Sequence, residues 1–168
     1  MNNSLLRTNE ELMFIYNRNV DIVYKICFMF MKNKFDAENI VQDAFVKLIE
    51  NAVDFESYEH EKAWLIRTAS NLCKNSLKNK WRKNVDIDDE KLNRPELCYI
   101  QTFESTGLTE KILSLPSKYK TVIYLYYYEG YKTSEIAAML SIKESTIRGH
   151  LCKGRKLLKL ELEEELII

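Results

Sequence analysis

Seven basic residues and no acidic one lie between Lys62 and Asn84, in a chain whose net charge is zero. At helical spacing five side chains of this stretch share one face, namely Arg67, Asn71, Lys74, Asn75 and Lys78. A second face is formed by Leu65, Ala69, Leu72 and Ser76. Lysine and arginine neutralise phosphates, and asparagine pairs with base edges. The stretch therefore predicts a helix that binds nucleic acid, the alternative being a helix whose basic face is merely solvated.

A second basic group lies near the end of the chain, where Glu144 is the only acidic residue among six basic ones in residues 143–159. Residues 136–140 form a short apolar helical pattern, and residues 141–143 predict a tight turn. The following helix has one inward stripe, made of Ile147, Leu151, Gly154 and Leu158. This pattern predicts a helix-turn-helix, whose second helix enters the major groove of DNA. A helical hairpin with a charged back is the alternative.

The outward side of that last helix carries the candidate DNA contacts. Eight residues belong to this set: Ser145, Thr146, Arg148, Gly149, Cys152, Lys153, Arg155 and Lys156. Arg148 and Lys153 are suited to guanine edges, whereas Arg155 and Lys156 are suited to phosphates, which fix register without reading sequence.

The elements that position these residues are predicted to be helices throughout. Residues 10–31 and residues 36–50 have apolar side chains at helical spacing, and Asp36 is predicted to cap the second of these helices. Residues 51–61 are polar and irregular. Residues 84–107 lose periodicity, and Leu108 begins another helical group. We therefore expect an all-α protein with two small helical domains, residues 8–84 and 108–163, joined by a linker at 85–107.

Composition limits the class of protein. Hydrophobic residues make up 46% and charged residues 30%, which is typical of a soluble globular protein. No apolar run reaches the roughly 20 residues of a membrane helix, and the N-terminus turns acidic too early for a signal peptide. We expect a cytoplasmic protein that does not insert into a membrane. The four cysteines and two histidines lack metal-site spacing, so we expect no metal, no cofactor and no disulfide framework.

Three stretches, in this order, resemble the extracytoplasmic-function sigma factors of bacterial RNA polymerase, the compact members of the sigma-70 superfamily. DAENIVQDAFVKLIE (Asp36–Glu50) resembles the region-two helix that docks on the β′ clamp of the polymerase. Lys62–Asn84 resembles the helix that melts and reads the minus-ten promoter element. Leu115–Lys159 resembles region four, which reads the minus-thirty-five element and meets the β flap. The resemblance implies core RNA polymerase and promoter DNA as partners, and leaves an anti-sigma factor open.

The resemblance assigns roles to individual residues. Gln42 and Asp43 match the polymerase-docking pair, with Asn39 where the family commonly has aspartate. Asn71 matches the residue that holds a base flipped from the minus-ten strand. Phe55 and Tyr58 fall in the loop that encloses that base, with simple anchoring of the loop as the alternative.

Some positions depart from the family pattern. Trp64 stands at the family's usual tryptophan, for which core packing is the plain interpretation. Gly149 and His150 replace the common Ser-Arg pair, so the promoter sequence does not follow from this chain. Ser141 replaces the usual turn glycine, at a cost of roughly 1 kcal/mol if the turn needs a positive φ. Lys132 and Lys143 stand where capping serines are usual, and Thr133 and Ser145 are predicted to cap instead.

No catalytic constellation is evident, so we expect a transcription initiation factor and not an enzyme. Two alternatives remain open at this point. One is a stand-alone helix-turn-helix regulator that binds operator DNA, and the other is a helical adaptor without a DNA role. The acidic helix followed by the basic, amide-rich helix favours the initiation factor, because a regulator has no use for a strand-melting surface.

Overall fold

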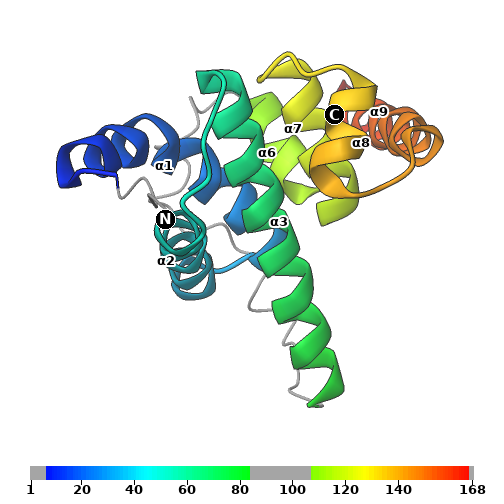
Figure 1. The fold of residues 1–168 in the computed structure, drawn as a ribbon. Coiled ribbons are helices and arrows are strands. Elements are labelled where there is room, and N and C mark those ends of the chain that lie inside the picture. Colours follow the sequence, from blue (N-terminus) through cyan, green and yellow to red (C-terminus); the bar gives the residue numbers. More distant parts are fainter. Residues whose placement is uncertain (1–6, 84–106, 167–168) are drawn as a thin grey trace. The chain divides into compact units, whose positions relative to one another are not determined.

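The computed structural model describes residues 7–83 and 107–166, and this part of the chain is helical with no strand (Figure 1). The chain divides into two compact units. The first contains α1 (Asn9–Met31), α2 (Lys34–Asn51) and α3 (Tyr58–Arg82). The second contains α6 (Gly107–Ser114), α7 (Ser117–Tyr127), α8 (Thr133–Leu140) and α9 (Glu144–Leu166). The predicted all-α fold class is confirmed.

The first unit is a three-helix bundle in which every helix packs against the other two. Its core comes from one apolar face of each helix, and the fully buried members include Val23, Ile26, Leu48, Leu65 and Ile66. Cys27 of α1 and Cys73 of α3 are free thiols in this core. A hydrogen bond with Cys73, together with burial, raises the pKa of Cys27, so this thiol stays protonated.

The helix ends of this unit follow capping chemistry. Thr8 and Glu11 form a reciprocal capping box at the start of α1. The prediction that Asp36 caps the second helix is wrong: Asn33 is the N-cap, and its side-chain oxygen accepts a hydrogen bond of 2.8 Å from the Asp36 backbone N–H. Asp36 instead lies in the first turn, where the positive end of the helix dipole stabilises a carboxylate.

The third helix begins earlier than the sequence pattern predicts. The polarity of residues 51–61 predicts an irregular segment, but Ser57 caps α3 by accepting a hydrogen bond of 3.1 Å from the His60 backbone N–H. Tyr58 is therefore the first residue of α3 and not a loop residue. Apolar periodicity does not reveal the start of α3, because the first turn of this helix is mostly exposed and carries polar residues.

The second unit is built around α7, which contacts α6, α8 and α9. Gly154 permits a close approach of α9 to α7, because a Cβ at this position would lie 2.5 Å from the Cδ1 of Ile123 on α7. Ile136, Ile147 and Leu125 are fully buried between these helices. The buried ammonium of Lys120 donates to the Leu113 carbonyl at 3.1 Å and thereby ties α7 to the end of α6.

Two turns of this unit have left-handed backbone. Gly130 follows α7 with φ 73°, a left-handed conformation that glycine adopts readily after the end of a helix. Ser141 ends α8 with φ 56° and ψ 45°, so the position that usually holds glycine does need a positive φ. The predicted Thr133 cap is wrong, because Lys132 occupies the N-cap position and Glu135 accepts from its backbone N–H at 2.7 Å.

Among the described residues, no helix has the length and apolar character that crossing a membrane requires.

Candidate nucleic-acid interface

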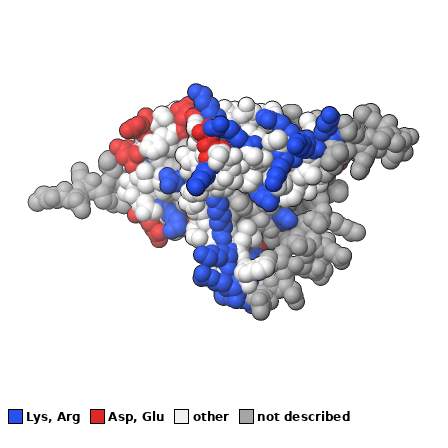
Figure 2. Space-filling view, turned by 90° about the vertical axis from the view of Figure 1, so that its right-hand side faces the viewer, with Lys and Arg blue, Asp and Glu red and all other residues white. Residues whose placement is uncertain are grey.

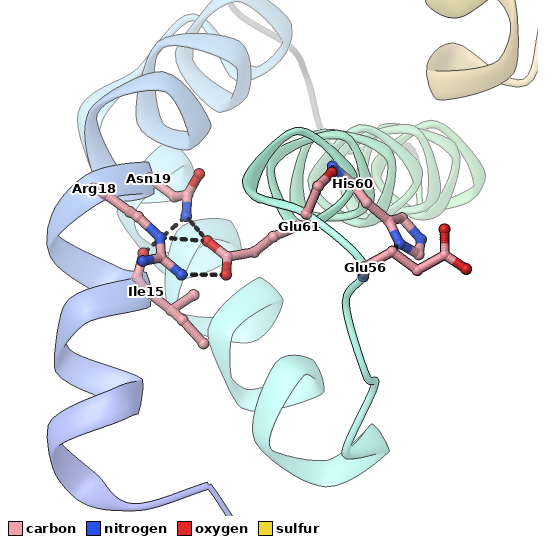
Figure 3. Close-up of polar contacts among 7 residues, drawn as sticks. Ile15, Arg18, Asn19, Glu56, His60 and Glu61 are labelled. Atoms are coloured by element: carbon pink, nitrogen blue, oxygen red, sulfur yellow. Dashed lines mark hydrogen bonds and ion pairs between the residues drawn. The ribbon is translucent and has the colours of Figure 1, made fainter.

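An ion pair between α1 and α3 sets the start of the basic helix (Figure 3). Arg18 donates to both carboxylate oxygens of Glu61, with Nε to Oε1 at 2.7 Å, although Glu61 is only 3% exposed. Asn19 donates to the same Oε1 at 2.6 Å and to the Ile15 carbonyl at 2.9 Å. The hydrogen bond to Glu61 raises the pKa of Arg18. This network satisfies a buried carboxylate one turn before Leu65, where the packed part of α3 begins.

A second ion pair fixes the other end of that helix. Lys80 of α3 donates to a carboxylate oxygen of Asp36 in the first turn of α2. Burial opposes ionisation of Asp36, but hydrogen bonds from Lys80 and Asn33 outweigh burial and lower the pKa of this carboxyl group. Lys80 therefore supports the bundle, because its ion pair joins α3 to the start of α2.

The predicted nucleic-acid stripe lies on the surface of α3. Arg67, Asn75 and Lys78 are exposed, whereas Asn71 and Lys74 are half-buried. Burial lowers the pKa of Lys74. Figure 2 shows Lys and Arg side chains in a column that follows α3 toward its C-terminal end. The helix thus presents the cationic face that its spacing predicts.

A groove of about 510 Å³ opens between the end of α2 and the middle of α3. Asn71 and Asn75 line it from α3, and Lys47 and Asn51 line it from α2. Trp64 forms part of its wall. The groove therefore combines one cation, three amides and one aromatic ring, which are the groups that hold a single unstacked base.

Sequence reasoning missed the α2 side of this groove. Lys47 and Asn51 are not in the predicted interface, because residues on different helices come together only through the tertiary fold. The spacing of four residues between Lys47 and Asn51 is the sequence signal that places them on one edge of a helix. In the structure Asn51 donates to the Lys47 carbonyl at 2.7 Å.

Phe55 and Tyr58 do not line this groove. They line a separate pocket of about 850 Å³ between the 52–57 loop and the start of α1. The Phe55 ring meets Trp64 edge-on at 5.9 Å between ring centroids, and the Arg7 guanidinium lies 5.0 Å above it. Tyr58 is 70% exposed, with the Arg18 guanidinium 4.3 Å from its ring centroid. The contacts of Phe55 favour anchoring of the loop, and a base-binding role for Phe55 and Tyr58 stays a prediction.

The predicted polymerase-docking residues lie together on the outer face of α2. Asn39, Gln42 and Asp43 are all exposed. Val46 continues the same face one turn later and is 48% exposed. The surface is thus a small acidic and amide patch with an apolar edge.

The outer face of α9 is exposed over its full predicted set. Ser145, Thr146, Arg148, Gly149, Cys152, Lys153, Arg155 and Lys156 are all solvent-accessible. Ile147 and Leu151 are buried against the rest of the unit. Helical spacing therefore predicted the side of α9 that faces outward, whereas the role of each residue stays a prediction.

Contacts within the unit orient two of these cations. Arg148 pairs with Glu144 at 3.2 Å, and Glu144 in turn accepts a hydrogen bond of 2.7 Å from the Thr133 hydroxyl on α8. The Thr133 hydrogen bond, with help from Arg148, lowers the pKa of Glu144. Arg155 donates from Nε to the Tyr127 hydroxyl at 2.6 Å. Glu144 therefore holds the Arg148 side chain near the start of α9, and Tyr127 holds the Arg155 side chain against the end of α7.

His150 is one of the two residues that replace the usual Ser-Arg pair, and its surroundings keep it uncharged. Burial, followed by the charges of Lys118 and Lys153, lowers the pKa of His150, and its ring packs edge-on against Tyr119 at 5.5 Å. A neutral, half-buried imidazole supplies no cation to DNA at neutral pH. Arg148 and Lys153 therefore carry the positive charge that this part of α9 itself supplies.

Comparison with known proteins places both units in one family. The model of sigma-70 region 2 matches residues 15–83, and the model of sigma-70 region 4 matches residues 106–158. The RNA polymerase sigma factor SigV of Bacillus subtilis is 30% identical over 146 residues, which cover 84% of this chain and 85% of SigV. The ECF RNA polymerase sigma factor SigW of the same organism is 28% identical over 159 residues, covering 86% of this chain and 84% of SigW.

The fold has a solved counterpart. A crystal structure of the sigma factor RpoE in complex with the anti-sigma factor NepR from Bartonella quintana matches with a TM-score of 0.63 and 17% identity, covering 92% of this chain and 95% of that one. The family models span both units, and the relatives span most of the chain in a single alignment. The chain therefore belongs to the sigma-70 family, in its extracytoplasmic-function group.

Proposed function

We propose that this protein binds core RNA polymerase, directs it to specific promoters and assists DNA melting. The observation that carries this proposal is the acid-free stripe of α3, which runs past a groove lined by Asn71. A protein that only binds duplex DNA needs cations for phosphates, but it needs no groove for a single base. The resemblance of both units to sigma factors, and the names of the relatives, support the same partners.

Each unit has a part in the proposed mechanism. Asn39, Gln42 and Asp43 dock the first unit on the β′ clamp, and the second unit meets the β flap. Arg148 and Lys153 on α9 read the minus-thirty-five element, while Arg155 and Lys156 hold phosphates. In the sequence these surfaces belong to the proposed domains 8–84 and 108–163. The proposed linker falls largely in residues 84–106, outside the described residues.

Strand opening is assigned to the groove. One base of the minus-ten strand unstacks and enters between Asn71 and the α2 side chains Lys47 and Asn51. Arg67, Lys74 and Lys78 follow the phosphates on either side. Unstacking costs a few kcal/mol, and the free energy gained when the groove binds the base offsets this cost. Binding to duplex DNA by the free protein is therefore weak, because the polymerase must space the two units on the promoter.

The rival function is a stand-alone regulator that binds operator DNA. The decisive experiment mixes the full chain with core polymerase, separates the complex by gel filtration and assays run-off transcription on genomic DNA. Co-elution together with discrete, chain-dependent transcripts supports the initiation factor. Absence of co-elution, combined with tight duplex binding by the chain alone, supports the regulator instead.

A further inference from the structure

The most exposed large apolar side chain among the described residues is Trp81, at 78%. It lies in the last turn of α3, eight residues beyond Cys73, the final buried residue of that helix. In Figure 1 the C-terminal turns of α3 run beyond the ends of α1 and α2. A tryptophan buries more apolar area than most side chains when it has a partner, so its 78% exposure leaves a large apolar surface available to one.

Helical geometry places Trp81 on the nucleic-acid stripe. At 3.6 residues per turn, the series Arg67, Asn71, Lys74, Lys78 and Trp81 stays within an arc of about 80°. The spacing between successive members alternates between four and three residues, which keeps them on one face. Trp81 thus continues the line of side chains that begins beside the groove.

Charge identifies the occupant of this surface. Lys78, Arg82 and Lys83 flank Trp81 in the sequence and are exposed, and no acidic residue occurs between Lys62 and Asn84. Lys80 is the exception, because Asp36 binds it. An aromatic ring within such a cationic segment suits a strand that carries both phosphates and unpaired bases. Protein interfaces also bury tryptophan, but an uninterrupted run of cations beside the ring matches a phosphate backbone more fully than it matches a protein surface of mixed charge.

We infer that Trp81 is a stacking platform for a base of single-stranded promoter DNA, a second base contact beyond the groove at Asn71. Ten residues separate the two side chains, which is about 15 Å along the helix, or roughly four nucleotides at 3.4 Å each. The assignment to the promoter strand rests on the proposed function. The stacking itself does not, because every base has a π-face.

The test measures binding of the full chain to a fluorescein-labelled dT 12-mer at low salt, followed by anisotropy. Trp81→Ala should weaken binding roughly 5- to 150-fold, which is the range for loss of one stacked base. Trp81→Phe should recover part of that loss. Arg82→Ala is the matched control at the neighbouring exposed position. It should lower the dependence of affinity on salt by about one counterion, which Trp81→Ala should not do.

A 12-mer of abasic sugar-phosphate units separates stacking from charge. Wild type and Trp81→Ala should bind this backbone equally. Three results would each overturn the inference. Wild type and Trp81→Ala bind dT with equal affinity, or Trp81→Ala loses as much affinity for the abasic strand as for dT. The third is that wild type shows no measurable binding to dT. Loss of co-elution with core polymerase in Trp81→Ala, with dT binding unchanged, would make Trp81 a protein contact. Failure of the wild-type chain in the run-off assay would contradict the proposed function, whatever the dT result.

Discussion

Arg18 of α1 holds both carboxylate oxygens of Glu61 on α3, and the two ends of this ion pair differ in exposure. The Glu61 side chain is 4% exposed, whereas that of Arg18 is 37% exposed. Water can therefore solvate Arg18 if its partner is removed, but it reaches Glu61 poorly. The pair joins the N-terminal half of α1 to the first turn of the helix that carries the nucleic-acid stripe.

This asymmetry predicts unequal effects of the two single substitutions. Arg18→Met leaves a buried carboxylate with Asn19 as its remaining described partner and should lower the free energy of unfolding by about 2–3 kcal/mol. Glu61→Gln keeps the shape, frees an arginine that water can reach, and should cost about 1 kcal/mol. Urea unfolding followed by circular dichroism measures both. Lys34→Met removes an exposed pair at 3.9 Å and should change stability by less than about 0.5 kcal/mol. Equal losses for Arg18→Met and Glu61→Gln would contradict the role given to burial.

Asp43 is predicted to be essential for docking on the polymerase. It is exposed beside Gln42, so reversal of its charge should not disturb folding. Asp43→Lys should abolish co-elution with core polymerase and leave helicity by circular dichroism unchanged. Asp21→Lys reverses an exposed carboxylate on α1 and is the matched control, with co-elution retained. Wild-type co-elution of Asp43→Lys would remove the docking role from this face of α2.

Arg148 is predicted to read a base pair of the upstream element. Glu144 aims its guanidinium from the first turn of α9, and a bidentate contact to guanine is worth about 1–3 kcal/mol of discrimination. Arg148→Ala should therefore relax preference at one base pair when holoenzyme is assayed on a set of single-base promoter variants. Lys156→Ala should weaken binding by a similar factor on every variant, as a phosphate contact does. A uniform loss for Arg148→Ala would reassign it to a phosphate.

Ser141 is predicted to carry a backbone penalty that glycine would relieve. With φ 56°, it has a conformation that L-residues disfavour by roughly 1 kcal/mol. Ser141→Gly should raise the free energy of unfolding of the second unit by about 0.5 kcal/mol, because the gain is partly offset by the freer unfolded chain. Ala138→Gly, at an exposed interior position of α8, should instead destabilise by about 1 kcal/mol. Thermal unfolding of both variants decides the sign, and a stability loss in Ser141→Gly would refute the prediction.

Local patterns in the sequence predicted what local physics determines. The outward residues of α9 follow from helical spacing, and the tight turn predicted at residues 141–143 is where Ser141 has its positive φ. The cap of α2 did not follow, because Asn33 and Asp36 both suit an N-cap. Asp36 instead pairs with Lys80, which lies 44 residues away in the sequence and so belongs to no local pattern.

The same limit applies to the groove. Asn71 was predicted from its place on one helix, but Lys47 and Asn51 join it only when α2 packs against α3. The burial of Glu61 was also unpredictable, because its acidic neighbours in the sequence are exposed and only Arg18 and Asn19, 43 and 42 residues away, make its burial tolerable. Sequence periodicity identifies the face of a helix, and tertiary packing selects the partners of that face.

Capture of a base beside Asn71 is the step by which this chain is proposed to open promoter DNA. The most direct measurement of that step is permanganate reactivity of unpaired thymines on a promoter identified by run-off transcription. Core polymerase with wild-type chain should give reactive thymines in the minus-ten region, and core polymerase alone should give none. Asn71→Ala should reduce this reactivity, and wild type and Asn71→Ala should react alike on a promoter whose captured base is replaced by an abasic site. Wild-type reactivity for Asn71→Ala on the native promoter would remove Asn71 from strand opening, and absence of reactive thymines with the wild-type chain would contradict strand opening by this protein altogether.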